Sequence, residues 1–254
     1  LYIQAANTLA GEPEDAAFEQ QYSAALKGPW DRAQNGELYA WFQNTEEARR
    51  LFKQAASMTR CQFPILTARP GDTFLAAVLM PPLSAVRQLA RLMAIEGHLF
   101  EHEGKVREAL EAYLAAFRVA GHLGREPILI TGLVGIACQA IACKAMGDCL
   151  ARQHIQKDIL EWLAANLAEL ENSLPDRSAW IVGERAQAFQ IARMSPDELG
   201  PEGLTEGQRA FLRSRAFRIL WPDRTIRKDF EGFYDAVQRL AELHPWECAA
   251  ALRI

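Results

Sequence analysis

Apolar residues recur along most of this chain with the three- and four-residue spacing of α-helices, and no run alternates as a β-strand would. The clearest helical stripe runs from about Lys105 to Ala120, with charged residues on its opposite face. A similar stripe from Val86 to Phe100 follows Pro82, which suits the first turn of a helix. Because only a few residues around Gly104 separate the stripes, we expect an antiparallel helical hairpin.

The stretch from Ile128 to Leu150 is apolar nearly all round. A membrane span needs about 20 apolar residues, whereas only the 16 residues from Ile128 to Cys143 are free of charge. We therefore interpret this stretch as a central helix packed on both sides, and we do not expect an integral membrane protein. Gly132 and Gly135 would let a neighbouring helix approach closely.

Further helices are expected on both sides of this core, and the predicted fold class is all-α. They cover residues 1–9, 14–26, 45–59, 159–171, 176–195, 210–220 and 225–243. Thr45 is expected to cap its helix. Residues 60–82 are rich in proline and are expected to be irregular, with Phe63, Ile65 and Leu66 tucked against the helices. Residues 195–207 hold two Pro and three Gly, which predicts a boundary between a main helical domain (1–195) and a C-terminal helical extension (196–254).

The predicted hairpin carries small, aromatic and turn residues at regular intervals. They are Gly97, Phe100, Gly104, Ala109, Tyr113 and Ala116. This spacing resembles the tetratricopeptide repeat, and the resemblance implies close helix packing at Gly97 and Ala109, beside the two aromatic rings. The sequence departs from that motif at Met93, where the motif has Trp, and at Glu96, where it has Leu, and no proline closes the unit.

A poorer copy of the same spacing lies upstream. It consists of Gly36, Tyr39, Ala48, Phe52 and Ala55. The two copies are 61 residues apart, which is not a multiple of the ~34-residue repeat. We therefore expect an irregular assembly of α–α hairpins that is tetratricopeptide-like only in part. The segment from Leu83 to Pro127 is also similar to bacterial, often exported proteins, a resemblance that implies no activity.

Composition excludes several classes of protein. Half of the 254 residues are hydrophobic and 24% are charged, which indicates a globular chain and not a disordered one. The net charge of −4 gives no support to nucleic-acid binding, and acidic residues dilute the arginines of 209–228. The five cysteines are interpreted as small buried residues, with one disulfide, for example through Cys61, as the alternative. The sequence begins at Leu1 and not at Met, so its localisation stays open between an exported protein whose leader has been removed and a cytoplasmic protein.

One short motif suggests metal chemistry. Residues 98–102 read HLFEH, which resembles the signature of inverted zincins. On a helix His98 and His102 lie one turn apart and could share a zinc ion, with Glu101 as the general base. Those enzymes are mixed α/β, and no third ligand is marked out, so we expect no metal. The alternative interpretation is a solvated helix end near Gly104.

A second group of charged residues suggests a polar pocket between helices. Its candidate ligand-binding residues are Arg60, Arg125, Glu126, Glu184 and Arg185. They flank strongly apolar stretches, where a buried charge must be paired. The alternatives are structural ion pairs and exposed charges.

Sequence motifs for phosphate binding or nucleophilic catalysis are missing, so no catalytic residue and no cofactor are assigned and enzymatic activity stays open. The tetratricopeptide resemblance implies a scaffold that binds a protein or peptide partner. The alternative function is a small-ligand-binding protein or enzyme that uses the polar pocket.

Overall fold

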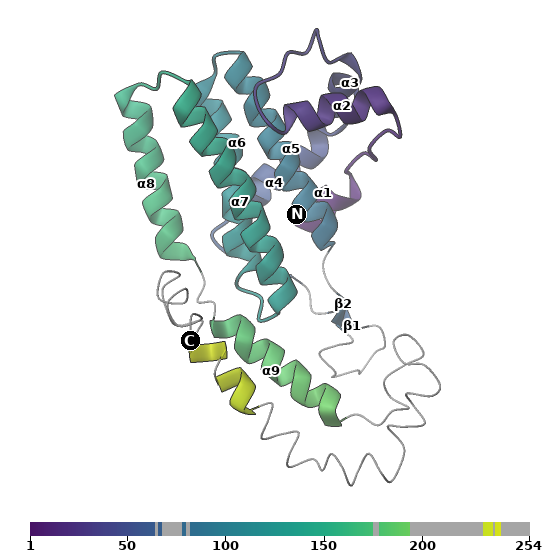
Figure 1. Cartoon of the computed structure of the whole chain (residues 1–254), viewed down its shortest axis with the longest axis vertical. Coiled ribbons are helices and arrows are strands. Elements are labelled where there is room, and N and C mark those ends of the chain that lie inside the picture. The colour runs from purple at the N-terminus through teal and green to yellow at the C-terminus, as the bar shows by residue number, and fades with distance from the viewer. Residues whose placement is uncertain are drawn as a thin grey trace, which may run out of the picture. The chain divides into compact units, whose positions relative to one another are not determined.

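The computed structural model describes residues 1–63, 66–67, 78–79, 82–174, 178–193, 231–235 and 237–239, and this part of the chain is all-α apart from one short ladder (Figure 1). Its helices are α1 (Tyr2–Asn7), α2 (Ala16–Ala25), α3 (Gly36–Asn44), α4 (Glu46–Ala56), α5 (Leu83–His102), α6 (Val106–Leu123), α7 (Leu129–Arg152), α8 (Lys157–Ser173) and α9 (Ser178–Arg193). In the segment expected to be irregular, β1 (Leu66–Thr67) pairs antiparallel with β2 (Val78–Leu79). A ladder of two residues per strand is too short to leave an alternating pattern in the sequence.

The chain divides into two compact units. The first comprises Leu1–Phe63, Met80–Glu126 and Ile130–Pro175, and the second comprises Pro64–Leu79, Pro127–Leu129 and Asp176–Ile254. The predicted domain boundary at 195/196 and the helix predicted at 210–220 lie outside the described residues. Within the helix predicted at 225–243, residues 231–235 and 237–239 are described, and they are helical.

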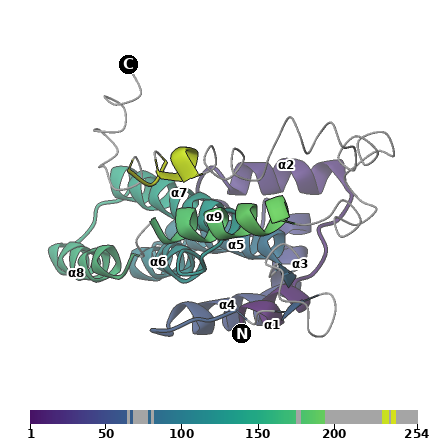
Figure 2. The same ribbon diagram turned by 90° about the horizontal axis from the view of Figure 1, so that it is seen from below.

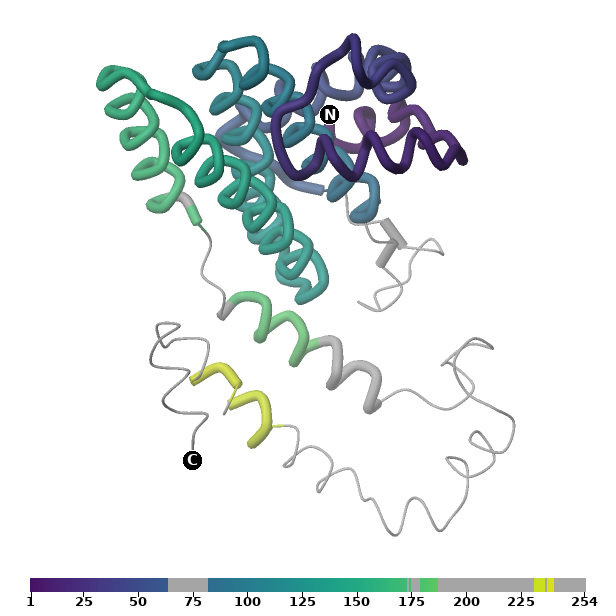
Figure 3. The backbone as a smooth tube through the Cα atoms, turned by 45° about the horizontal axis from the view of Figure 1, so that its top comes forward, coloured from purple at the N-terminus to yellow at the C-terminus, as the bar shows by residue number. Residues whose placement is uncertain are grey.

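Helices α5 and α6 lie side by side and are joined by three residues (Figure 3). Gly104 ends α5 with φ of 73°, the left-handed conformation that favours glycine. The Gly104 amide donates to the Glu101 carbonyl (3.1 Å) and the Lys105 amide to the Phe100 carbonyl (2.8 Å), which together form a Schellman motif. Gly97 lies within α5, and a Cβ built on it would lie only 2.2 Å from Cε1 of Tyr113 of α6. The predicted close packing at Gly97 is therefore confirmed.

Helix α7 packs against both members of this hairpin (Figures 1 and 2). Gly132 and Met146 of α7 are buried. So are six other residues, all small, which recur three and four positions apart. They are Thr131, Gly135, Cys138, Ala142, Ala145 and Cys149. A Cβ built on Gly135 would lie 3.1 Å from the Ala120 carbonyl oxygen of α6, so the glycine permits the close approach expected of it. Helix α8 packs on α6, where Arg118 donates to the Asn166 side chain (2.9 Å).

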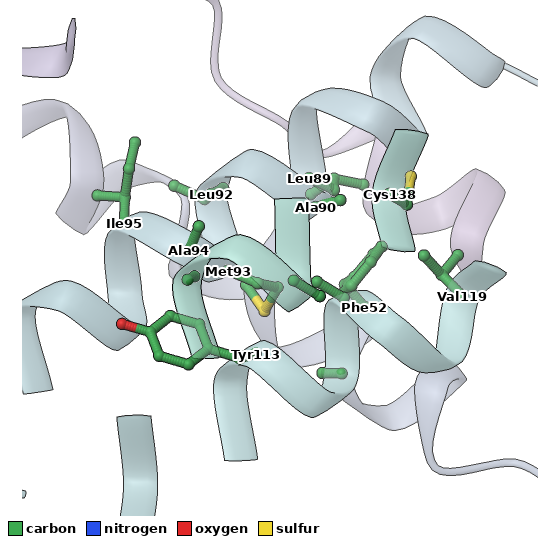
Figure 4. Close-up of a cluster of buried hydrophobic side chains, with 14 of the residues drawn as sticks. Phe52, Leu89, Ala90, Leu92, Met93, Ala94, Ile95, Tyr113, Val119 and Cys138 are labelled. Carbon is green, nitrogen blue, oxygen red and sulfur yellow. The ribbon is translucent and has the colours of Figure 1, made fainter. Parts of the chain in front are cut away.

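Helices α1 and α4 cover the other side of the hairpin (Figure 2). Phe52 of α4 meets side chains of α5, α6 and α7 in one buried cluster (Figure 4). The indole N–H of Trp30 donates to the Ile95 carbonyl of α5 (2.8 Å). Thr45 stands at the start of α4 as predicted, but its hydroxyl donates to the Phe42 carbonyl (2.7 Å) and makes no capping bond. Phe63 is buried, as expected from the sequence.

Candidate functional site

A carboxylate is buried at the end of α5, where α6 and α7 converge. Glu101 accepts a hydrogen bond from the Tyr113 hydroxyl (2.5 Å). It also forms an ion pair with Arg152 of α7, whose Nη2 lies 3.1 Å from Glu101 Oε1. Its side chain is fully buried, so these donors replace the water that an ionised carboxylate requires. Burial next to this carboxylate raises the pKa of the Tyr113 phenol far above its ordinary value and that of the Cys149 thiol to about 12. We call Glu101, Tyr113 and Arg152 the Glu101 cluster.

Next to this cluster lies His98, which is also buried. Its Nδ1 is 2.7 Å from the Ala25 carbonyl oxygen, which can only accept, so Nδ1 carries the hydrogen. The other nitrogen, Nε2, then holds a lone pair 4.0 Å from Glu101 Oε1 and has no hydrogen-bond partner within the described residues. Burial lowers the pKa of His98, which keeps the ring neutral.

The three candidate zinc-site residues of the HLFEH motif lie in different surroundings. His98 and Glu101 are buried, so the expectation of a solvated helix end is wrong for both, because the end of α7 covers them. Only His102 is exposed, and its Nε2 lies 4.0 Å from Asp31. Among the described residues, no three His, Cys, Asp or Glu side chains come together as a metal site.

A second buried carboxylate lies five residues earlier on α5. Glu96 pairs with Arg49 and with Lys53 of α4, and the Lys53 Nζ is 3.0 Å from Oε1. Arg49 also lies over the Phe42 ring, 3.7 Å from its centroid. Through the two ion pairs, Glu96 ties α4 to α5. Both carboxylates of α5 thus join helices together.

Two of the predicted ligand-binding residues instead hold the chain that follows α4. Arg125 donates to the Thr59 carbonyl (2.9 Å), and Glu126 accepts from the Phe63 amide (3.2 Å). Nearby, the Tyr2 hydroxyl bonds His122 Nδ1 (2.7 Å), while His122 Nε2 lies 2.9 Å from the Met58 carbonyl. These contacts fasten residues 58–63 to the end of α6, and Arg60 in their midst is exposed.

The remaining two predicted residues lie on α9, in the second unit. Arg185 forms an ion pair with Asp235 (2.7 Å). Glu184 lies near enough to Tyr234 for its negative charge to contribute to the raised pKa of that phenol, after burial as the larger cause. Within their own unit, Arg185 therefore contacts, and Glu184 lies near, a helical segment that follows much later in the sequence. The five-residue pocket stays a prediction.

The described cysteines are all free. Cys138 and Cys149 are buried, as expected, and burial raises the pKa of each thiol to about 12. Thiolates are the reactive form of cysteine, so these two are unsuited to nucleophilic catalysis. Cys61 is half-buried and Cys143 is exposed, whereas Cys248 lies outside the described residues.

Helix α7 leaves several large aliphatic residues exposed, whereas Val134 and Ile141 are half-buried against the core and Met146 is buried. Leu133, Ile136 and Leu150 are 49%, 41% and 41% exposed. The prediction that this helix is packed on both sides is therefore wrong. The exposed stripe, which we call the α7 outer face, alternates three- and four-residue steps. It consists of Leu133, Ile136, Ala140, Cys143, Gly147 and Leu150.

Sequence reasoning missed the α7 outer face because a helix that is apolar all round gives no sign of which side is covered. Side-chain size gives no clear sign either, since the exposed series includes the small residues Ala140, Cys143 and Gly147. Among the described helices, α7 is also the one long and apolar enough to cross a membrane, a test that core helices pass as well. No protein-family model, curated protein or solved structure matches this chain.

Proposed function

We propose that this protein is a helical scaffold that binds a protein partner through the α7 outer face. The observation that carries this proposal is the exposure of several large aliphatic side chains on one side of α7. Small residues, such as Gly135 and Ala142, face the hairpin, whereas Leu133 and Ile136 face outward. Burying large aliphatic side chains is a main source of helix stability, so leaving a row of them exposed favours an interface over a solvated surface.

The tetratricopeptide resemblance is consistent with this proposal. Such repeats stack, so that the first helix of each hairpin packs on the hairpin before it. Helix α7 packs on both α5 and α6 in this manner, and its Thr131, Gly135 and Cys138 repeat the spacing of Met93, Gly97 and Phe100. The resemblance implies a protein or peptide partner bound in a groove between helices, whereas this proposal places the partner on the exposed side of α7.

The alternative of a small-ligand pocket has weaker support. Two of its five residues, Arg125 and Glu126, already bind backbone groups of residues 59 and 63. The buried residues of the Glu101 cluster are likewise engaged with one another, so they offer no free group to a substrate.

The test is site-specific photo-crosslinking in cells that produce the full chain. A benzoylphenylalanine at position 133 should yield a discrete cross-linked polypeptide. The same group at position 160, an equally exposed leucine of α8 (44%), serves as the matched control and should yield none. The purified partner should then bind the wild-type chain and lose affinity for Ile136→Glu. Equal cross-linking at both positions, or at neither, would refute the proposal.

A further inference from the structure

We infer that the end of α7 is attached to α5 by a pH-sensitive switch, in which Glu101 exchanges its ion pair with Arg152 for one with His98 when His98 takes up a proton. The structure places both partners beside the same carboxylate. Arg152 reaches it from α7, with Nε 3.3 Å from Oε2 and Nη2 3.1 Å from Oε1. His98 lies one turn earlier on α5, with Nε2 4.0 Å from Oε1. This switch is independent of the proposed function.

The Nε2 atom of His98 is available for the exchange because no other group bonds it. The His98 side chain is 2% exposed, and Nε2 has no hydrogen-bond partner within the described residues. The other ring nitrogen is already engaged, since Nδ1 donates to the Ala25 carbonyl of α2 at 2.7 Å. A proton taken up by the ring therefore enters at Nε2, within reach of Glu101.

Arg152 has a second anion close by on its own helix. Its Nη1 lies 3.9 Å from Asp148, one turn earlier, and its side chain is 33% exposed. Leaving Glu101 would therefore not bury an unpaired guanidinium group, because Asp148 and water can solvate it. Asp148 also pairs with Lys144, which is 71% exposed, and an ion pair of this kind contributes little to stability.

The charged and titratable groups that face His98 come from three helices, and α2 adds the Ala25 carbonyl. They are Glu101 of α5, Tyr113 of α6, and Asp148 and Arg152 of α7. Burial is the main cause that lowers the pKa of His98, and the positive charge of Arg152 lowers it further, whereas the Ala25 carbonyl and the two carboxylates raise it. The ring is therefore neutral at neutral pH, and Arg152 holds Glu101.

Acidification reverses this preference. Below about pH 6.5, protonation of His98 and departure of Arg152 assist each other, because moving the guanidinium away removes the repulsion between the two cations. The last turn of α7 then loses its ionic attachment to α5.

The first experiment is an NMR titration of the full chain from neutral to mildly acidic pH. Long-range proton–nitrogen spectra report the His98 ring, and the Nε–H signal of Arg152 reports its bond to Glu101. At neutral pH we expect the ring hydrogen on Nδ1. On acidification Nε2 should become protonated, and the Arg152 signal should change with the same midpoint, below pH 6.5. The amides of residues 149–152 should lose protection against hydrogen exchange at that midpoint.

Three variants separate the switch from acid unfolding. His98→Gln keeps a donor for the Ala25 carbonyl but cannot take up a proton, so the Arg152 signal should no longer change at the wild-type midpoint. His122→Gln is the matched control, since His122 is also buried but lies in the last turn of α6, and it should preserve the coupled titration. Arg152→Gln removes the competing cation, so the His98 midpoint should rise by about one pH unit or more.

Four outcomes would overturn the inference. They are a His98 ring that protonates with no change at Arg152, an Arg152 signal that changes equally in His98→Gln, a neutral ring with its hydrogen on Nε2, and a chain that unfolds by circular dichroism before His98 protonates. If His98→Gln does not fold, Arg152→Gln decides, and an unchanged His98 midpoint in that variant refutes the switch.

Discussion

Replacing Gly97 by alanine should strongly destabilise the first unit. The added Cβ would lie 2.2, 2.5 and 2.8 Å from Cε1, Cζ and Cδ1 of Tyr113, whose ring is fully buried. The ring would have to move by roughly 1 Å, and overpacking of this kind costs about 1–3 kcal/mol. The movement also strains the Tyr113–Glu101 hydrogen bond, and a bond to a charged group contributes about 1.5–3 kcal/mol.

Alanine is a better helix former than glycine by about 1 kcal/mol, which offsets part of this cost. We therefore expect a net loss of about 2–4 kcal/mol in the free energy of unfolding, measured by urea denaturation with tryptophan fluorescence. In a Tyr113→Leu background the clash is relieved, and the same substitution should become nearly neutral. Gly121→Ala is the control, because a Cβ there meets nothing within 4 Å. An unchanged stability, or an equal loss in both backgrounds, would refute the packing explanation.

Three further predictions concern the buried polar groups. Arg152→Met should lower the free energy of unfolding by about 2–4 kcal/mol, because it leaves the buried Glu101 without its cation; the 33% exposure of Arg152 keeps the loss from being larger. The double variant Arg152→Met/Glu101→Gln should recover part of this loss in the same urea assay. Burial lowers the pKa values of His98 and His122 below 6.5, so the unfolded chain binds protons first. Stability should therefore be full above about pH 6.5 and fall below it, by at most about 1.4 kcal/mol per pH unit per histidine, with a shallower slope in His122→Gln. Glu126→Ala should speed hydrogen exchange of the Phe63 amide, whereas Arg185→Ala should leave that amide unchanged.

Local patterns predicted the hairpin because its determinants are close in sequence. Gly104 ends α5 as expected, and Gly97 meets Tyr113 sixteen residues later. Interactions over longer separations left no such signal. The contact between Glu101 and Arg152 spans 51 residues, and that between Phe63 and Glu126 spans 63. A charge in the sequence shows that it needs a partner if buried, but many partners satisfy that need equally.

The stability of the hairpin and the exposure of the α7 outer face follow from one arrangement. Arg152 binds Glu101 at one end of α7, and Gly135 lies against the Ala120 carbonyl near the other, which fixes the rotation of the helix. Turning α7 by one residue, or about 100°, would bring Ile136 toward Ala120, where even a Cβ is at 3.1 Å. Leu133 and Ile136 therefore face outward. Because they contribute little to the hairpin, substitutions on the α7 outer face should weaken association without unfolding the first unit, so binding and folding can be measured separately.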